Sequence, residues 1–148
     1  MKVKCIYNTG MDLRPYENKS MQVEQLGRFG ASGLSKYGEV SLGKEYLVMG
    51  IIVFETYQAY LIDDGLISAC PCQLFEIMDK KISANWDART IEKDENIYPY
   101  IQMIIGYQEL CSDKASYEKL IVEKEEEAQR IYFRRKIEVE KELLEKFD

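Results

Sequence analysis

The sequence predicts an α+β protein, in which a small antiparallel β-barrel is followed by C-terminal helices, the last of them long. Up to about residue 92, short runs rich in β-branched and aromatic residues alternate with turn residues, as in small barrels and sandwiches. From about residue 99 the apolar residues follow helical spacing, and no proline or glycine occurs after Ser112. We therefore expect a barrel over residues 1–96 and a helical segment packed on it over residues 97–148.

The first expected strand runs from Lys2 to Asn8 and ends at the turn residues Asn8-Thr9-Gly10. Residues 10–44 are predicted to form a long, irregular surface loop, because they show little period and hold further glycines. These glycines do not match a phosphate-binding loop, since no lysine-serine pair follows a strand at the right distance. The glycines are Gly27, Gly30, Gly33, Gly38 and Gly43.

The run EYLVMGIIVFETYQAYLID predicts two strands, divided near residues 55–58, with a bend or bulge at Gly50. Asp63-Asp64-Gly65 has the chemistry of a tight hairpin turn, because glycine accepts a positive φ. Leu66 to Ala69 is the expected returning strand, and Pro71 ends it because proline has no N–H to donate. A helical turn over residues 72–74, a strand over 75–78 and an extended piece over 87–92 complete the barrel.

The second half is expected to be helical. Pro99 should open a helix that carries Ile101, Ile104, Ile105 and Leu110 at helical spacing, and Ser112 should cap the next one. That second helix should continue to residue 147 with one break near residue 125. Its apolar residues make no continuous heptad seam, which favours a helix packed on the barrel over a coiled coil.

Charges on the last helix alternate in blocks. Glu126 and Glu127 precede Arg130 and Arg134 at spacings that allow i,i+4 ion pairs, so we interpret this face as solvated and salt-bridged. A basic patch for RNA is the alternative interpretation.

The amino-acid composition argues against several classes of function. The 148-residue chain has no histidine, which removes the commonest general base and metal ligand and lowers the expectation of an enzyme. The net charge of −6 argues against direct nucleic-acid binding. The first ten residues lack the apolar stretch of a signal peptide, and the longest apolar run, Leu47 to Phe54, is too short to cross a bilayer. The sequence therefore predicts a cytoplasmic protein.

The four cysteines are expected to be packed thiols. Cys70-Pro71-Cys72 lacks the two-residue spacer of a redox or zinc-binding pair, and Cys5 and Cys111 are far away in the sequence. Isolated cysteines usually behave as small buried apolar residues. We expect neither a metal site nor another cofactor, although four sulfur ligands remain an alternative.

Acidic and aromatic residues supply the candidate binding face. Eleven tyrosines against one tryptophan suggest aromatic recognition, although tyrosines also half-bury in sheets for packing alone. Asp63 and Asp64 are interpreted as turn residues rather than catalytic acids, because adjacent strand residues point to opposite faces. The candidate partner-binding residues are Glu55, Tyr57, Tyr60, Asp63, Asp64, Asp94 and Glu95.

Several segments resemble a known family. GKEYLVMGI, YLIDDG, CPCQLFEIMD with the following NW, and the later IYFRRK are similar to a group of small Gram-positive proteins with an SH3-like barrel. The group appears among predicted immunity proteins of bacterial toxin systems. The resemblance spans roughly residues 1–136 and is strongest from Gly43 to Trp86. It implies an SH3-like barrel and a non-enzymatic role, and it brings no catalytic motif.

These lines together predict a non-enzymatic binding protein. An acidic protein suits a basic protein partner, such as the nuclease domain of a toxin, because charge attraction speeds encounter and buried tyrosines slow release. The alternatives are a regulatory or adaptor protein that grips a peptide or protein with its barrel, including a phage-type anti-defence inhibitor. An enzyme that relies on aspartate and tyrosine alone is the third.

Overall fold

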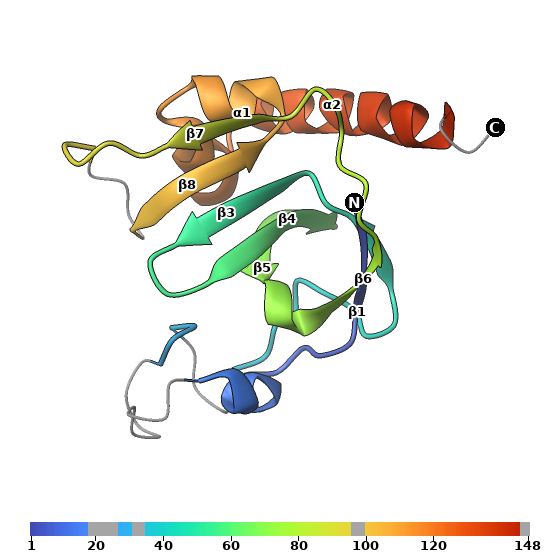
Figure 1. Ribbon diagram of the computed structural model, residues 1–148, viewed down its shortest axis with the longest axis vertical. Helices are drawn as coiled ribbons and strands as arrows, with labels where there is room; N and C mark the ends of the chain where they lie inside the picture. Colours follow the sequence, from blue (N-terminus) through green and yellow to red (C-terminus); the bar gives the residue numbers. More distant parts are fainter. Residues whose placement is uncertain (18–26, 31–34, 96–99, 146–148) are drawn as a thin grey trace.

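The computed structural model describes residues 1–17, 27–30, 35–95 and 100–145, and it consists of two antiparallel sheets and C-terminal helices (Figure 1). The smaller sheet has the strand order β2-β1-β6. The larger sheet has the order β5-β4-β3-β8-β7. The strands are β1 (Lys2–Cys5), β2 (Glu45–Leu47), β3 (Gly50–Phe54), β4 (Gln58–Asp64), β5 (Leu66–Pro71), β6 (Phe75–Asp79), β7 (Asp87–Thr90) and β8 (Ile101–Gly106).

The α+β class with C-terminal helices is confirmed, and so are most of the predicted strands. Within the described residues neither sheet closes on itself, so the closed barrel is not confirmed. The chain passes from the smaller to the larger sheet between Leu47 and Gly50, where the sequence predicted a bend. It passes back through the short 3₁₀ turn η2 (Cys72–Leu74), which was predicted as a helical turn.

The β4–β5 hairpin forms as the turn residues predicted. Gly65 has a φ of +79°, and Asp64 pairs with Leu66 directly across it. Only glycine adopts such a φ without strain, so the turn is fixed at this residue. Asp63 and Asp64 are the last residues of β4, and their side chains reach different elements on its two sides.

The irregular segment after β1 is only partly described. It includes the 3₁₀ helix η1 (Met11–Tyr16), and Thr9 forms an isolated bridge with Lys36. Residues 18–26 and 31–34, with Gly33 among them, lie outside the described residues, and so do Pro99, the expected helix start, and the domain boundary at residues 96–97.

The predicted helix is wrong over residues 101–106, although Leu110 does lie in a short helix (residues 108–112). Residues 101–106 form β8, which pairs with β3 on one side and β7 on the other. Ile101 and Ile104 are both buried, a spacing that suggested a helix. The β3–β8 register shifts by one residue between Val53 and Phe54, and this bulge turns both isoleucines to the same face of the sheet.

Helices follow β8. They are α1 (Gln108–Ser112), a π-helical turn η3 (Glu118–Val122) and α2 (Glu126–Glu145). The predicted break near residue 125 is confirmed, because Lys124 has a φ of +52° between η3 and α2. Ser112 does not cap the next helix; it ends α1, and the Asp113 carboxylate accepts the Ala115 N–H at 2.9 Å. No described helix has the length and apolar character needed to cross a membrane.

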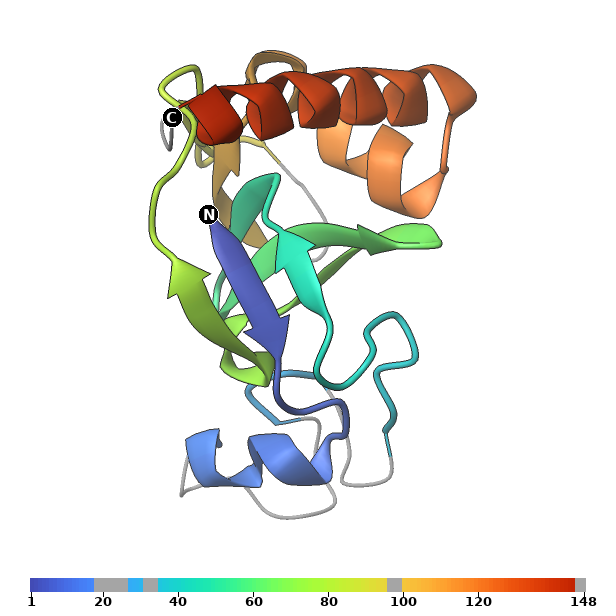
Figure 2. The ribbon, with the colours of Figure 1, turned by 90° about the vertical axis from the view of Figure 1, so that its right-hand side faces the viewer.

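Two clusters of buried side chains stabilise the fold. One lies between the larger sheet and the helices, where Tyr132, Val139 and Leu143 of α2 join residues such as Ile52 and Ile104. The other lies between the two sheets and the N-terminal segment, and contains Val3, Leu13 and Phe75 among others. The long helix is therefore packed on the sheet, as predicted (Figure 2).

The predicted ion pairs on α2 form in part. Arg130 binds Glu126 at 2.6 Å and Glu127 at 3.7 Å. Arg134 instead binds Glu109 of α1 at 3.2 Å, and Arg135 binds the same carboxylate at 2.8 Å. These contacts join the two helices, so the charges on this side of α2 are already partnered within the chain.

Candidate functional site

A groove of about 610 Å³ lies between the smaller sheet, the β4–β5 turn and the C-terminal half of α2. Figure 2 shows the three elements around it: the long helix above, the hairpin projecting to one side, and β1 and β2 below. Charged and apolar side chains share its lining. The lining residues are Lys2, Lys44, Glu45, Tyr46, Leu47, Asp63, Asp64, Gly65, Asp79, Lys136, Glu140, Leu143 and Leu144.

Asp64 forms one polar contact point of the groove. Its carboxylate accepts hydrogen bonds from Lys44 Nζ at 2.7 Å, the Tyr46 hydroxyl at 2.6 Å and Ser41 Oγ at 3.0 Å. The hydrogen bonds from Lys44 and Tyr46 lower the pKa of Asp64 to about 2, because they stabilise the charged form. Asp64 is therefore ionised at neutral pH and occupied by partners within the chain.

Asp63 forms a second contact point, on the other side of β4. It accepts the buried Tyr132 hydroxyl at 2.8 Å, and Lys136 Nζ at 2.9 and 3.0 Å. Burial, and then the nearby Asp63 charge, raise the pKa of Tyr132, so this hydroxyl stays protonated and donates. The hairpin is thus tied to α2 by a carboxylate that belongs to the fold.

The remaining charges of the groove are mostly negative. Once the pairs Lys44–Asp64 and Lys136–Asp63 are set aside, three carboxylates of the lining face one ammonium group. The carboxylates are Glu45, Asp79 and Glu140, and the ammonium group is Lys2; among the described residues no ion pair within 4 Å includes any of these four. Asp79 accepts the Lys81 N–H at 2.9 Å. Burial lowers the pKa of the Met1 amine, and the nearby Asp79 charge partly offsets this effect.

Apolar side chains lie beside these charges. Leu143 is buried, and Leu144 is 68% exposed although it lines the groove. Leu47 of β2 contributes from the opposite wall. Burial of the Leu144 side chain by a partner would be favourable.

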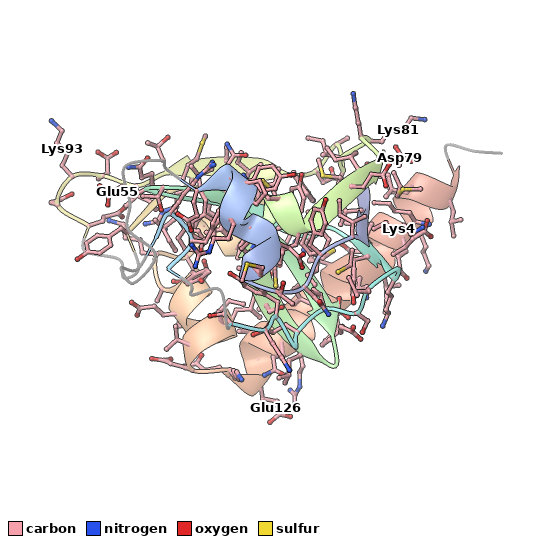
Figure 3. The ribbon with its side chains drawn as sticks, turned by 90° about the horizontal axis from the view of Figure 1, so that it is seen from below. Lys4, Glu55, Asp79, Lys81, Lys93 and Glu126 are labelled. Carbon is pink, nitrogen blue, oxygen red and sulfur yellow. The ribbon has the colours of Figure 1, made fainter. Side chains whose placement is uncertain are left out.

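The structure separates the predicted site residues into two ends of the molecule. Glu55 and Tyr57 lie in the β3–β4 turn, and Asp63 and Asp64 lie at the other end of β4, about 20 Å away for a seven-residue strand. Figure 3 shows Glu55 on the opposite side from Asp79. The single acidic and aromatic face expected from the sequence therefore does not form.

The hairpin tyrosines serve packing. Tyr60 is 8% exposed and its ring lies 5.7 Å from that of Phe75. Tyr57 is half-buried, with its ring 4.8 Å from Phe54 and 5.5 Å from Phe29. Neither ring is presented as an exposed anchor, so the packing interpretation of these tyrosines is the one that the structure supports.

Asp94 and Glu95 lie in the β7–β8 connection, toward the Glu55 end. Asp94 is exposed. Glu95 is held by Arg89 at 2.6 Å and Lys114 at 3.2 Å, and the Glu92 N–H is the main cause of its lowered pKa. Glu95 therefore stabilises its own loop rather than an open surface.

The four cysteines are free thiols. Burial raises the pKa of Cys70 to about 11 and also raises the pKa of the other three, so none is an activated thiolate. In the part of the chain that the structure describes, no three potential ligands gather as a metal site would need. Nothing in the geometry assigns these sulfurs a chemical role.

Sequence reasoning missed most of the groove. Lys2, Asp79, Glu140 and Leu144 come from three distant parts of the chain, and no local motif marks them. The available signal was weak, because Leu144 shares the exposed surface of the last helix with other apolar side chains, Phe133 and Ile137.

No protein-family model matches this chain, and no curated protein or solved structure is significantly similar to it. The groove and its charges are therefore the main basis for a functional proposal.

Proposed function

We propose that this chain is a non-enzymatic binding protein of the cytoplasm, and that it acts as an immunity protein by binding a basic toxin domain directly. The observation that carries the proposal is the groove, whose unpaired charge is negative and whose walls include an exposed leucine. A basic protein surface would complement the charge, and its apolar atoms would cover the leucine.

The whole-molecule charge supports the same partner. A net charge of −6 attracts a cationic domain over a Debye length of about 10 Å, and so raises the association rate. The absence of histidine and of an activated thiol supports a role in binding rather than catalysis. The resemblance to predicted immunity proteins points to the same role.

We further propose that the two sheets are an open form of an SH3-like barrel. In support, β2 and β3 are successive parts of one run divided between the sheets, β1 pairs with both β2 and β6, and a 3₁₀ turn joins β5 to β6. The pair β7 and β8 extends the larger sheet beyond such a barrel.

A regulatory or adaptor role remains the second candidate, because a groove open between a helix and a sheet also suits a peptide segment. A phage-type anti-defence inhibitor belongs to the same class of binding protein.

Co-expression with the product of the adjacent gene tests the proposal. If that product is a toxin, cells that carry both genes should survive, and the two proteins should co-purify in a 1:1 complex whose formation weakens with salt. Survival without any complex would overturn direct neutralisation. Capture of a non-toxic basic host protein instead would favour the adaptor role.

A further inference from the structure

The carboxylates of the groove that form no ion pair lie beside leucine side chains, so the lining is both acidic and apolar. Glu140 of α2 lies one helical turn before the exposed Leu144, and Asp79 and Glu45 come from the sheet on the opposite side. A ligand in the groove would therefore meet leucine side chains along its length and carboxylates on both walls.

This combination matches one kind of chemical group. Arginine and lysine have an aliphatic stem that packs on apolar surface and a charged head that binds carboxylates. A metal ion would not use the leucines, and an anion would meet the three unpaired carboxylates.

We infer that the groove receives an arginine or lysine side chain of the protein partner, with its stem against Leu47, Leu143 and Leu144 and its head near Glu140 and Asp79. The inference rests on the proposed binding function and adds the chemistry that is recognised.

The lysines of the groove do not neutralise this site. Lys44 is bound to Asp64 at 2.7 Å and Lys136 to Asp63 at 2.9 Å, so both ammonium groups are directed at carboxylates of the β4–β5 hairpin. Asp64 keeps its charge down to a pH of about 2, which keeps Lys44 partnered at neutral pH. The competitors of the incoming cation are then Lys2 and the Met1 ammonium group, whose pKa is affected by the nearby Asp79 charge as well as by burial.

A peptide titration followed by NMR tests the inference without the natural partner. The probe is the capped peptide Gly-Leu-Arg-Leu-Gly, and its control is the same peptide with citrulline, which has the shape of arginine but no charge. We expect chemical-shift changes at the amides of Leu47, Glu140 and Leu144, and a Kd about three- to fivefold lower for the arginine peptide, as for an exposed ion pair.

Variants with matched controls locate the contact. Glu140→Gln should remove the preference for arginine over citrulline, and Leu144→Ala should weaken both peptides. Glu126→Gln and Ile137→Ala, exposed positions of the same helix outside the groove lining, should change neither. Figure 3 shows Glu126 well away from Asp79. A one-dimensional spectrum of each variant verifies that it is folded.

The outcomes separate the inference from the proposed function. Equal binding of the two peptides, or shifts centred elsewhere, would overturn the inference even if a basic partner co-purifies. A partner complex that Glu140→Gln leaves unchanged would overturn it as well. If the arginine peptide binds as expected but no basic protein is captured by co-expression, the groove chemistry stands and the immunity role fails.

Discussion

Tyr132 is the residue that connects α2 to the β4–β5 hairpin from inside the core. Its side chain is completely buried, and its hydroxyl donates to Asp63 at 2.8 Å. Tyr132→Phe should lower the free energy of unfolding by about 1 to 2 kcal/mol, because Asp63 loses one donor but keeps Lys136. Urea unfolding measures the change.

The control is Tyr16→Phe, since Tyr16 is 41% exposed and uses its backbone carbonyl to bind Arg28. Tyr16→Phe should leave the midpoint of urea unfolding almost unchanged. An equal loss in both variants would mean that the Tyr132 hydroxyl has no special contact.

The Asp64 carboxylate makes the free energy of unfolding depend on pH. Its pKa is about 2 in the folded chain against an ordinary value of 3.8, so the unfolded chain binds the proton more readily between these values. The stabilisation is complete above about pH 4 and is lost as the pH falls toward 2. Thermal melts between pH 4 and 2 should show that the melting temperature of Asp64→Asn falls less steeply with pH than that of the wild type. Parallel curves would show that the carboxylate is not protected.

At the scale of elements, two glycines allow β3, β8 and α1 to approach closely. Gly50 and Gly106 are paired across the two strands. A Cβ at Gly106 would lie 2.8 Å from Leu110 Cδ2, 3.0 Å from the Met49 carbonyl oxygen and 3.2 Å from the Gly50 Cα. Gly106→Ala should therefore cost about 1 to 3 kcal/mol through overpacking, measured by chemical unfolding.

Gly38→Ala is the matched control, because a Cβ at Gly38 would have nothing within 4 Å and the φ of this residue is not positive. That change should be neutral or slightly stabilising, since alanine restricts the unfolded chain. Destabilisation of the two variants by the same amount would contradict the close-approach explanation.

The strands that the sequence predicted correctly are those with strong local turn chemistry. Gly65 and Pro71 delimit β5, and the break between β3 and β4 follows from Glu55 and Thr56. The error at β8 has a physical cause, because Ile101 and Ile104 are three residues apart and a bulge makes that spacing compatible with a strand. A bulge depends on the partner strand, and local periodicity does not contain it.

The candidate site was harder to predict than the fold. Asp63 and Asp64 were found because they precede a turn glycine, but their partners Lys136 and Lys44 come from other elements. Whether a carboxylate is free or paired depends on packing of α2 on the sheet, which no local pattern specifies. Glu140 lines the groove only because α2 packs against the sheet in this position.

At the scale of the whole molecule, the helical part and the sheets are not separable. β8 lies between β3 and β7 in the larger sheet, and side chains of α2 belong to the same buried cluster as that sheet. A chain that ends at residue 96 should therefore lack a cooperative thermal transition, because β3 loses a neighbour and its core loses its cover. Circular dichroism during heating measures this.

A chain that ends at residue 125 is the informative comparison. It keeps all eight described strands and removes only α2, so it should retain more β-signal than the shorter chain while exposing apolar surface that binds a dye such as ANS. Cooperative melting of the 96-residue chain would show that the smaller sheet and its cluster fold alone.

The N-terminus lies close to the groove, so a label attached there can report on binding. The Met1 amine donates to the Lys81 carbonyl, and the next residue, Lys2, lines the groove opposite Leu144. A fusion tag ahead of Met1 would begin two residues before the chain reaches the groove wall, so it should hinder a partner, whereas a small fluorophore there should change its emission on binding. A purification tag inserted at the Glu55–Thr56 turn would leave the groove clear, and the two tagged forms should differ in the partner that they retain.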